Sequence, residues 1–379
     1  MTRPGMDFIF TLHSHLPWVL NHGRWPHGSD WLCEAALDTY LPLLEVLRGL
    51  AADEVAAPVT IGFTPVLANQ LTSPVFAEEM EAFFTQRLAT CEEAPAALAA
   101  TGDTALLPIA RFWQARLLRL RQLFHEIDRD LVSAFRALED AGRLEIIGSA
   151  ATHGYLPLLA RDESIRLQLA VGASEHRRLF RRPPSGCWLP ECAYRPRGPW
   201  EPWPTAPRSG IRRGIEEHLG DAGFRYFFVD AHLAAAGRPL GLYGDPAGEP
   251  CVAVHPEADP AERRRSAYRA YRAAHARGTG AVSCFVRDPL ASMQVWSRFQ
   301  GYPGDEWYLE FHKIRWPGGL KLWRVSAPGS DLGAKEPYRP EAAADRARGH
   351  GEHFAGLLGG IAGAETRERD GVIVAPFDT

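Results

Sequence analysis

Short apolar segments recur along the chain and alternate with stretches that have helical periodicity. The apolar segments lie at 7–12, 59–63, 144–148, 186–189, 226–229, 282–286 and 372–375. Each is apolar on both faces, which is typical of strands buried on both sides of a parallel sheet. Helices are predicted between them, at 128–141, 163–179, 211–222 and 342–361. This alternation predicts an α/β fold.

Seven parallel strands favour a closed (β/α)7 barrel. An open doubly wound sheet has the same local pattern and is the competing architecture. The connection after the second strand, 66–142, is far longer than a crossover needs. It has helical periodicity at 76–88 and 107–124, and we interpret it as a helical insertion beside the barrel mouth.

Net charge and cysteine spacing limit the partners and the cellular location that the sequence predicts. The net charge of the 379 residues is −4, and the basic residues are scattered. The sequence therefore predicts no nucleic-acid partner, and no apolar run has the length of a membrane span. The N-terminus does not resemble a signal peptide. The six cysteines form no Cys-x-x-Cys pair, which favours a reducing, cytoplasmic location.

Polar side chains follow nearly every predicted strand. They include His13, His15, His153, Glu191, Asp230, His232, Arg287 and Asp378. In an α/β barrel the C-terminal ends of the strands meet at one rim, and the active site lies there. The sequence therefore predicts that these groups converge.

Glu191 and Asp378 are the pair that we select for catalysis. Cleavage of a glycosidic bond needs one carboxylic acid to protonate the leaving oxygen, and a second carboxylate to attack the anomeric carbon or activate water. Glu191 is flanked by Trp188, Pro190 and Cys192, and Asp378 follows an apolar strand that should raise its pKa. Each is equally compatible with an ordinary surface carboxylate after a strand.

The His13-Ser14-His15 segment has two interpretations. Both imidazoles lie on one face of a strand, where they could bind Zn²⁺ with Asp230 or His232, as in a metal-dependent polysaccharide deacetylase. Alternatively, His13 hydrogen-bonds sugar hydroxyls and His15 supports it. No tight ligand motif accompanies the histidines, so we favour sugar binding and expect neither a metal ion nor another cofactor.

At these residues the sequence resembles family 57 of the glycoside hydrolases, and most closely its α-1,4-glucan branching enzymes. Five stretches carry the resemblance: Leu12-His-Ser-His-Leu-Pro17, Ser149-Ala-Ala-Thr-His-Gly-Tyr-Leu-Pro157, Trp188-Leu-Pro-Glu-Cys-Ala-Tyr-Arg-Pro196, Phe228-Val-Asp-Ala-His232 and Ala375-Pro-Phe-Asp378. The Trp-Leu-Pro-Glu stretch is the most specific, whereas the His-x-His motif alone is weak.

The resemblance implies a (β/α)7 barrel with a helical insertion, and a retaining mechanism without a metal ion. By position, Glu191 resembles the nucleophile and Asp378 the general acid/base. Residues that resemble the lining of the substrate site are His13, Trp25, His153, Asp230, His232 and Trp296, and we add His15, Trp188 and Arg287. Tyr243 resembles a tyrosine on a mobile loop that closes over the site. The implied substrate is an α-glucan such as amylose or glycogen.

The sequence departs from the family after Asp378. The family continues with an aromatic run and a C-terminal helical domain, whereas this sequence ends at Thr379. We therefore expect that this domain is missing and that activity is impaired. The alternatives within the family are a 4-α-glucanotransferase and an α-amylase. The remaining alternative is an inactive glucan-binding remnant.

Overall fold

A parallel sheet forms the centre of the molecule. This computed structural model describes residues 5–56, 58–200, 209–235, 265–274, 281–327, 329–365 and 370–379. The sheet has the order β10 (Gly371–Asp378), β1 (Met6–Ser14), β2 (Val59–Phe63), β3 (Leu144–Ser149), β4 (Gly186–Trp188), β7 (Tyr226–Val229), β9 (Val282–Val286) and β8 (Tyr271–Ala273). All neighbours are parallel except β8 and β9. The seven predicted strands are confirmed, and β8 was not predicted.

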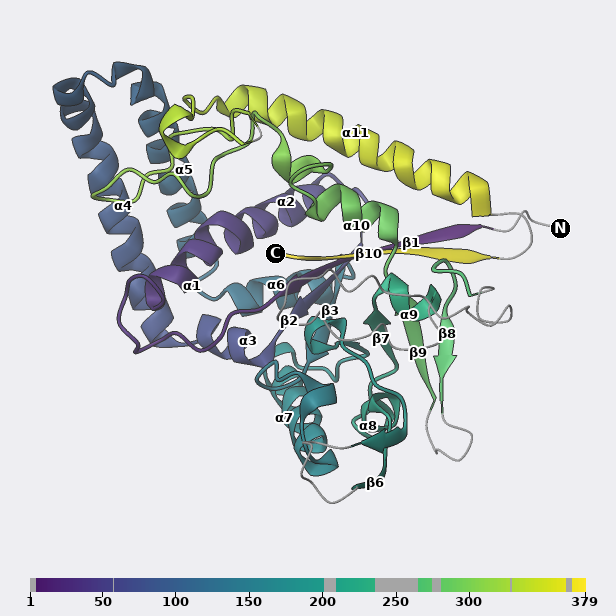
Figure 1. The fold of residues 1–379 in the computed structure, drawn as a ribbon. Coiled ribbons are helices and arrows are strands. Elements are labelled where there is room, and N and C mark those ends of the chain that lie inside the picture. The colour runs from purple at the N-terminus through teal and green to yellow at the C-terminus, as the bar shows by residue number, and fades with distance from the viewer. Residues whose placement is uncertain are drawn as a thin grey trace, which may run out of the picture.

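The sheet curls so that its two ends approach each other. Val372 and Val374 of β10 share one apolar cluster with Ile147 of β3 and Phe228 of β7. Next to β9, the Asp288 N–H donates to the Val374 carbonyl at 2.8 Å. No strand ladder joins β9 to β10 in the part of the chain that the structure describes. The fold is therefore a distorted (β/α)7 barrel, in which packing and hydrogen bonds outside the strand ladders link its two ends. Figure 1 shows the arrangement of its strands and helices.

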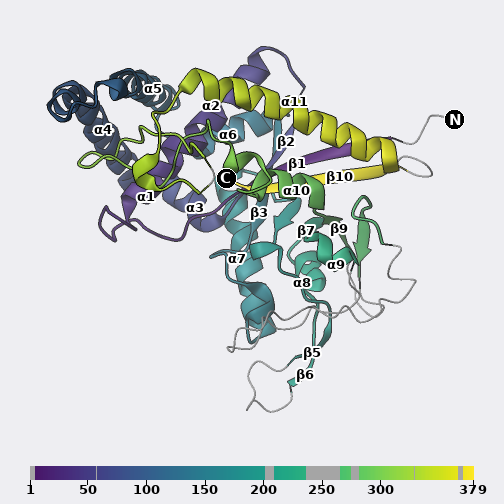
Figure 2. The same ribbon diagram turned by 45° about the horizontal axis from the view of Figure 1, so that its top comes forward.

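Helices from the first third of the chain cover one side of the barrel. They are α1 (Ser29–Ala35), continued by a π-helical turn (Ala36–Tyr40), α2 (Leu41–Ala52), α3 (Pro65–Leu71), α4 (Pro74–Thr101), α5 (Leu107–Glu126) and α6 (Leu131–Asp140). Figures 1 and 2 show α4 and α5 side by side at one end of the molecule. Phe63 of β2 packs against Phe135 of α6, with 5.1 Å between ring centroids. The helices of 66–142 thus share one core with the barrel strands.

Helices from the rest of the chain cover the other strands. They are α7 (Asp162–Phe180), α8 (Ile215–Asp221), α9 (Ala231–Ala235), α10 (Pro289–Trp296) and α11 (Pro340–Glu365). Short 3₁₀ turns lie at Thr104–Leu106, Leu156–Leu158, Pro190–Cys192, Tyr302–Gly304 and Leu332–Ala334. No helix in the described ranges has the length and apolar character needed to cross a bilayer.

The helix predicted at 211–222 is wrong at its beginning. Ile211 belongs to β6 (Ser209–Arg212), which pairs antiparallel with β5 (Gly198–Trp200). The helix begins only after Gly214, whose N–H donates to the Glu217 carboxylate at 3.0 Å. The other predicted helices are confirmed. Their ends differ by a few residues, except that the helix expected at 76–88 continues in α4 to Thr101.

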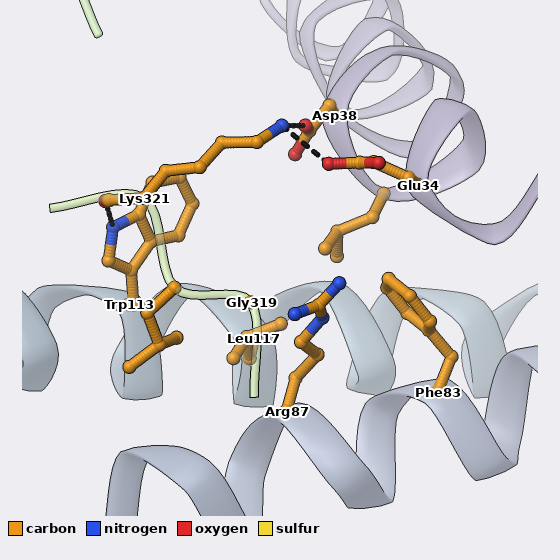
Figure 3. A pocket seen from close by; sticks show the side chains of 10 residues that line it. Glu34, Asp38, Phe83, Arg87, Trp113, Leu117, Gly319 and Lys321 are labelled. Carbon is orange, nitrogen blue, oxygen red and sulfur yellow. Dashed lines mark hydrogen bonds and ion pairs between the residues drawn. The ribbon is translucent and has the colours of Figure 1, made fainter. Parts of the chain in front are cut away.

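The irregular segment between α10 and α11 is anchored to the helical side of the barrel by Lys321. Its side chain is 7% exposed, and its ammonium lies 2.6 Å from Glu34 and 2.9 Å from Asp38 (Figure 3). The indole of Trp113 on α5 donates to the Lys321 carbonyl. One lysine therefore joins this segment to α1 and the π-helical turn.

Replacing Lys321 with Ala is expected to lower the free energy of unfolding by about 2 kcal/mol. Loss of a buried ion-pair partner costs more than this, but Glu34 and Asp38 are about one-third exposed and water can solvate them. Urea unfolding measures the change. The control is Lys313→Ala, whose ammonium contacts the Gly333 carbonyl. Equal losses in both variants would contradict the anchoring role.

Candidate active site

The C-terminal ends of the parallel strands bring the predicted groups to one rim. His13 lies near the end of β1, Glu191 follows β4, Arg287 follows β9 and Asp378 ends β10. The pKa of the buried Cys192 thiol responds to four charged groups at this rim. Burial raises its pKa to about 12, while Arg287 lowers it and Asp230, Asp378 and Glu191 raise it. These four charged groups therefore lie within electrostatic reach of one atom.

Glu191 is held in an uncommon backbone conformation. It has φ 58° and ψ 27° within the 3₁₀ turn, and Cys192 also has a positive φ of 50°. Two consecutive non-glycine residues in this region are rare, and such strain is typical of functional sites. The neighbouring residues Leu189, Pro190 and Cys192 are buried, whereas the Glu191 side chain is 71% exposed. The turn therefore projects the carboxylate into the open mouth.

A stack of three imidazoles lies beside Glu191. The Nε2 atom of His153 is 3.7 Å from Oε1 of Glu191. The His153 ring stacks on His15, with 4.0 Å between centroids, and on His13, with 4.9 Å. The other face of His13 lies on Trp188 at 4.4 Å, with 7° between the planes. Four of the predicted substrate residues thus form one continuous stack.

The structure buries His13 more deeply than a direct sugar contact requires. The residue is 3% exposed, and both ring nitrogens are inaccessible and have no hydrogen-bond partner among the described residues. The ring is sandwiched between Trp188 and His153, so it packs against one face of the His153 ring. His15 is the more accessible residue, and its Nδ1 lies 3.1 Å from the Thr64 hydroxyl. Of the two histidines, His15 is therefore the one that a ligand could reach more easily.

Burial keeps these imidazoles neutral. It lowers the pKa of His153 to about 3, with a further contribution from His15. Burial also lowers the pKa of His13 well below its usual value, helped by His153 and His15. A neutral imidazole has one donor and one acceptor nitrogen, which suits it to contacts with hydroxyl groups.

The lowered pKa of His153 predicts acid sensitivity. The unfolded histidine has a pKa near 6.5, so its contribution to stability is complete above that pH and is lost as pH falls toward 3. We expect the free energy of unfolding to decrease between pH 7.5 and 4.5, and to decrease less in His153→Gln. Urea unfolding at both pH values tests this. An identical decrease in the two proteins would contradict it.

Asp378 is fixed by the β1–β10 ladder. It pairs in register with His13, and the ladder extends back to Gly371. Beyond it, the Thr379 N–H donates to the His13 carbonyl at 2.8 Å. Burial raises the pKa of the Asp378 carboxyl, Arg287 opposes this and Glu191 raises it further. The group is therefore biased toward the protonated form that a general acid requires.

Arg287, Asp230 and Trp296 form a second side of the mouth. Arg287 Nη1 lies 3.3 Å from Asp230 Oδ1, and its guanidinium lies 6.0 Å from the centre of the Trp296 ring. Trp296 is 46% exposed at the end of α10. His232 lies in α9, but its side chain is outside the described residues, as is all of Tyr243.

Trp25 lies on the loop between β1 and α1. It is 67% exposed and meets Trp316 edge to face, with 5.5 Å between centroids. Trp316 was not among the predicted residues. No local signal singles it out, because the Trp-Pro dipeptide occurs at 25–26, 203–204 and 316–317. The two indoles form an exposed aromatic pair contributed by distant parts of the chain.

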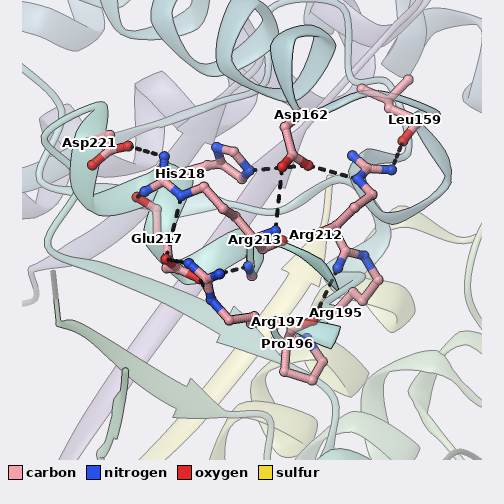
Figure 4. Close-up of polar contacts among 11 residues, drawn as sticks. Leu159, Asp162, Arg195, Pro196, Arg197, Arg212, Arg213, Glu217, His218 and Asp221 are labelled. Atoms are coloured by element: carbon pink, nitrogen blue, oxygen red, sulfur yellow. Dashed lines mark hydrogen bonds and ion pairs between the residues drawn. The ribbon is translucent and has the colours of Figure 1, made fainter. Parts of the chain in front are cut away.

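A polar network braces the chain that follows Glu191. The Tyr194 hydroxyl donates to Glu216 at 3.0 Å, and Arg197 pairs with Glu217. Behind them, Arg212 pairs with Asp162 of α7 (Figure 4). The hydrogen bonds of Arg197 and Gly214 hold the pKa of Glu217 at about 2, although burial would raise it. The network therefore ties 194–197 and 212–214 to α7 and α8.

The zinc interpretation of His13, His15 and Asp230 does not match this geometry. Within the described ranges, no three His, Cys, Asp or Glu side chains are grouped so that they could share a metal ion. Asp230 instead pairs with Arg287, and His15 with Thr64.

Comparison with known proteins identifies the family. Residues 9–314 match glycosyl hydrolase family 57. A 1,4-alpha-glucan branching enzyme of Thermococcus kodakarensis is 38% identical over 373 residues, which cover 98% of this chain and 52% of that protein. The crystal structure of the family 57-type branching enzyme of Pyrococcus horikoshii superposes with a TM-score of 0.84 and 38% identity, covering 99% of this chain and 63% of that one.

A more distant relative shares the fold. The alpha-amylase AmyC of Thermotoga maritima has a TM-score of 0.77 and 25% identity, covering 100% of this chain and 67% of that one. The chain spans about half the length of the Thermococcus relative, and its similarity extends over nearly all of its own 379 residues. The chain therefore belongs to glycosyl hydrolase family 57.

Proposed function

We propose that this chain is the catalytic barrel of a 1,4-α-glucan branching enzyme that retains anomeric configuration. The observation that carries the proposal is one chain of contacts across the mouth. Glu191 lies beside His153, His153 stacks on His13, and His13 pairs in register with Asp378. This chain links the ends of β4 and β10 around one open space. The similarity to branching enzymes supports the choice of substrate.

The first half-reaction breaks an α-1,4 bond. Asp378 in its protonated form donates its proton to the leaving glycosidic oxygen, while a Glu191 carboxylate oxygen attacks the anomeric carbon. The leaving chain departs with a free 4-hydroxyl, and the donor segment remains as an ester of Glu191. His153 contributes one wall of the donor site, and Arg287 with Asp230 contributes the other.

The second half-reaction forms the branch. Asp378 is now ionised and accepts the proton of an acceptor 6-hydroxyl, whose oxygen attacks the anomeric carbon and releases Glu191. Two inversions give net retention. Water competes with the acceptor, so the ratio of branching to hydrolysis depends on how well the mouth excludes water.

Linkage analysis of the products tests the proposal. The chain is incubated with amylose, and the α-1,6 anomeric protons are measured by NMR. New α-1,6 bonds support branching. Redistributed α-1,4 chains would indicate a 4-α-glucanotransferase, and an increase in reducing ends alone would indicate an α-amylase. Amylose binding without any turnover would identify a glucan-binding remnant and contradict the proposal.

We also propose the surroundings of this activity. The described cysteines are buried and unpaired, which supports a reducing, cytoplasmic location. The helices within 66–142 form an insertion that holds the segment between α10 and α11 through the hydrogen bond from the Trp113 indole to the Lys321 carbonyl. An α-glucan is the proposed partner.

A further inference from the structure

Two adjoining hollows lie in the irregular segment between α10 and α11. The larger has a volume of about 410 Å³ and includes Phe299, Glu310, Phe311, His312, Ser330 and Lys335 in its lining. The second has a volume of about 340 Å³ and includes Gln294, Tyr302 and Arg346. They share Arg298, Phe299 and Gly304. The two hollows therefore form one groove that passes over Phe299, and we call it the Phe299 groove.

Two aromatic rings of the Phe299 groove are unusually exposed. Phe299 is 79% exposed and Phe311 is 64% exposed. The guanidinium of Arg298 lies 4.8 Å from the centre of the Phe299 ring, and the ammonium of Lys321 lies 4.5 Å from that of Phe311. Exposed aromatic rings in a concave surface are typical of binding sites, and the C–H face of a pyranose packs well on such rings.

Two charged groups of the larger hollow, Glu310 and Lys335, neutralise each other. Glu310 accepts from Lys335 at 2.9 Å and lies 2.9 Å from His312 Nδ1. Lys335 also donates to the Val325 carbonyl at 2.7 Å. The third charged group, Arg298, lies over the Phe299 ring, where its N–H groups can donate to a hydroxyl. Hydroxyl groups can both donate and accept, so a neutral polyhydroxyl chain suits this lining.

The Phe299 groove lies near the candidate active site. Gln294 lines it on α10, the helix that ends at Trp296, and Phe299 follows Trp296 by three residues. Trp296 lies under Arg287, which pairs with Asp230 at the mouth. Three residues span about 11 Å at most, so Phe299 lies within that reach of Trp296. Figures 1 and 2 show the segment between α10 and α11 beside α1 and α5.

We propose that the Phe299 groove binds a stretch of α-glucan outside the catalytic mouth, with Phe299 and Phe311 as its stacking platforms. The inference rests on the proposed function, because it takes the same substrate. It predicts that long chains bind more tightly than short ones, since only a long chain reaches from the mouth to Phe311.

Binding is measured by affinity electrophoresis and calorimetry with amylose and with maltotriose. All variants carry Glu191→Gln, so that no turnover occurs during the measurement. Phe299→Ala and Phe311→Ala are each expected to weaken amylose binding about tenfold, with a smaller change for maltotriose. Phe299→Tyr should restore binding, and Phe299→Leu should not, because it lacks a ring. The control is Phe8→Ala, a 43% exposed ring near the opposite end of β1.

The outcomes separate this inference from the proposed function. Unchanged amylose binding in Phe299→Ala and Phe311→Ala would overturn the proposed groove. The proposed function would still stand if the wild-type chain turns amylose over. Equal weakening in Phe8→Ala would also overturn it, because the effect would then be general. If the wild-type chain neither binds amylose nor turns it over, both proposals fail. Selective weakening in the groove variants supports the inference.

Discussion

Replacing Glu191 with Gln is expected to reduce turnover of amylose by about 10⁴-fold or more. The amide is nearly isosteric with the carboxylate but cannot form the ester with the anomeric carbon. Removal of a nucleophile has effects of this size in other enzymes with covalent intermediates. Initial rates of iodine-complex loss and of α-1,6 bond formation measure the change.

The fold should not be affected by this substitution. The Glu191 side chain is 71% exposed, so the amide meets water as the carboxylate did. Thermal unfolding of Glu191→Gln is therefore expected to match the wild type. The matched control is Glu352→Gln, an exposed glutamate on α11, which should retain full turnover. Residual turnover in Glu191→Gln within tenfold of the wild type would exclude Glu191 as the nucleophile.

Replacing Asp378 with Asn is expected to reduce turnover of amylose by about 10²- to 10⁴-fold, the usual range for loss of a general acid or base. The reason is that the sugar leaving group of amylose needs a proton. An α-glucosyl fluoride has a leaving group that needs little protonation, so its first step should be affected much less. The rate of fluoride release, measured with an ion-selective electrode, checks this difference.

A small anion provides the complementary test of Asp378. Azide needs no general base, so it should accelerate turnover of the fluoride by Asp378→Asn and give an α-glucosyl azide. The wild type should not respond in this way. Equal losses on amylose and on the fluoride, without azide rescue, would mean that Asp378 acts only through the structure of β10.

The barrel could be predicted from the sequence because its strands are buried on both faces. Residues 372–377 are buried without interruption, and such a strand is a continuous apolar run that is easily recognised. Glu191 and Asp378 were selected for the same reason, since each follows one of these runs by two or three residues. Topology then requires both side chains to lie at the same edge.

The hairpin β5–β6 and the edge strand β8 gave no comparable signal. They have only three or four residues each, and several of these are Gly, Arg, Pro or Ser. The antiparallel pairing therefore depends on tertiary contacts, such as the ion pair between Arg212 and Asp162. The start of the helix near 211 was misplaced because this pairing removes Ile211 and Arg212 from the helical periodicity.

The detailed geometry of the site could not be predicted either. The sequence places His13 and His15 on one strand face, but it does not show that His153 inserts between them and the mouth. That position depends on the positive φ of 57° at His153 and on the curl of the sheet. The Trp25–Trp316 pair and the Lys321 anchor also join residues almost 300 positions apart, and no local pattern reveals such contacts.

Trapping the covalent intermediate tests the account most directly. A fluorinated α-glucosyl fluoride reacts quickly with a retaining enzyme and is released slowly, so the glycosyl-enzyme accumulates. Peptide mapping by mass spectrometry should then locate one sugar on the peptide that contains Glu191, and the label should be absent from Glu191→Gln. Turnover of amylose without any trapped sugar, or a sugar ester on another residue, would contradict the assignment of Glu191 as the nucleophile.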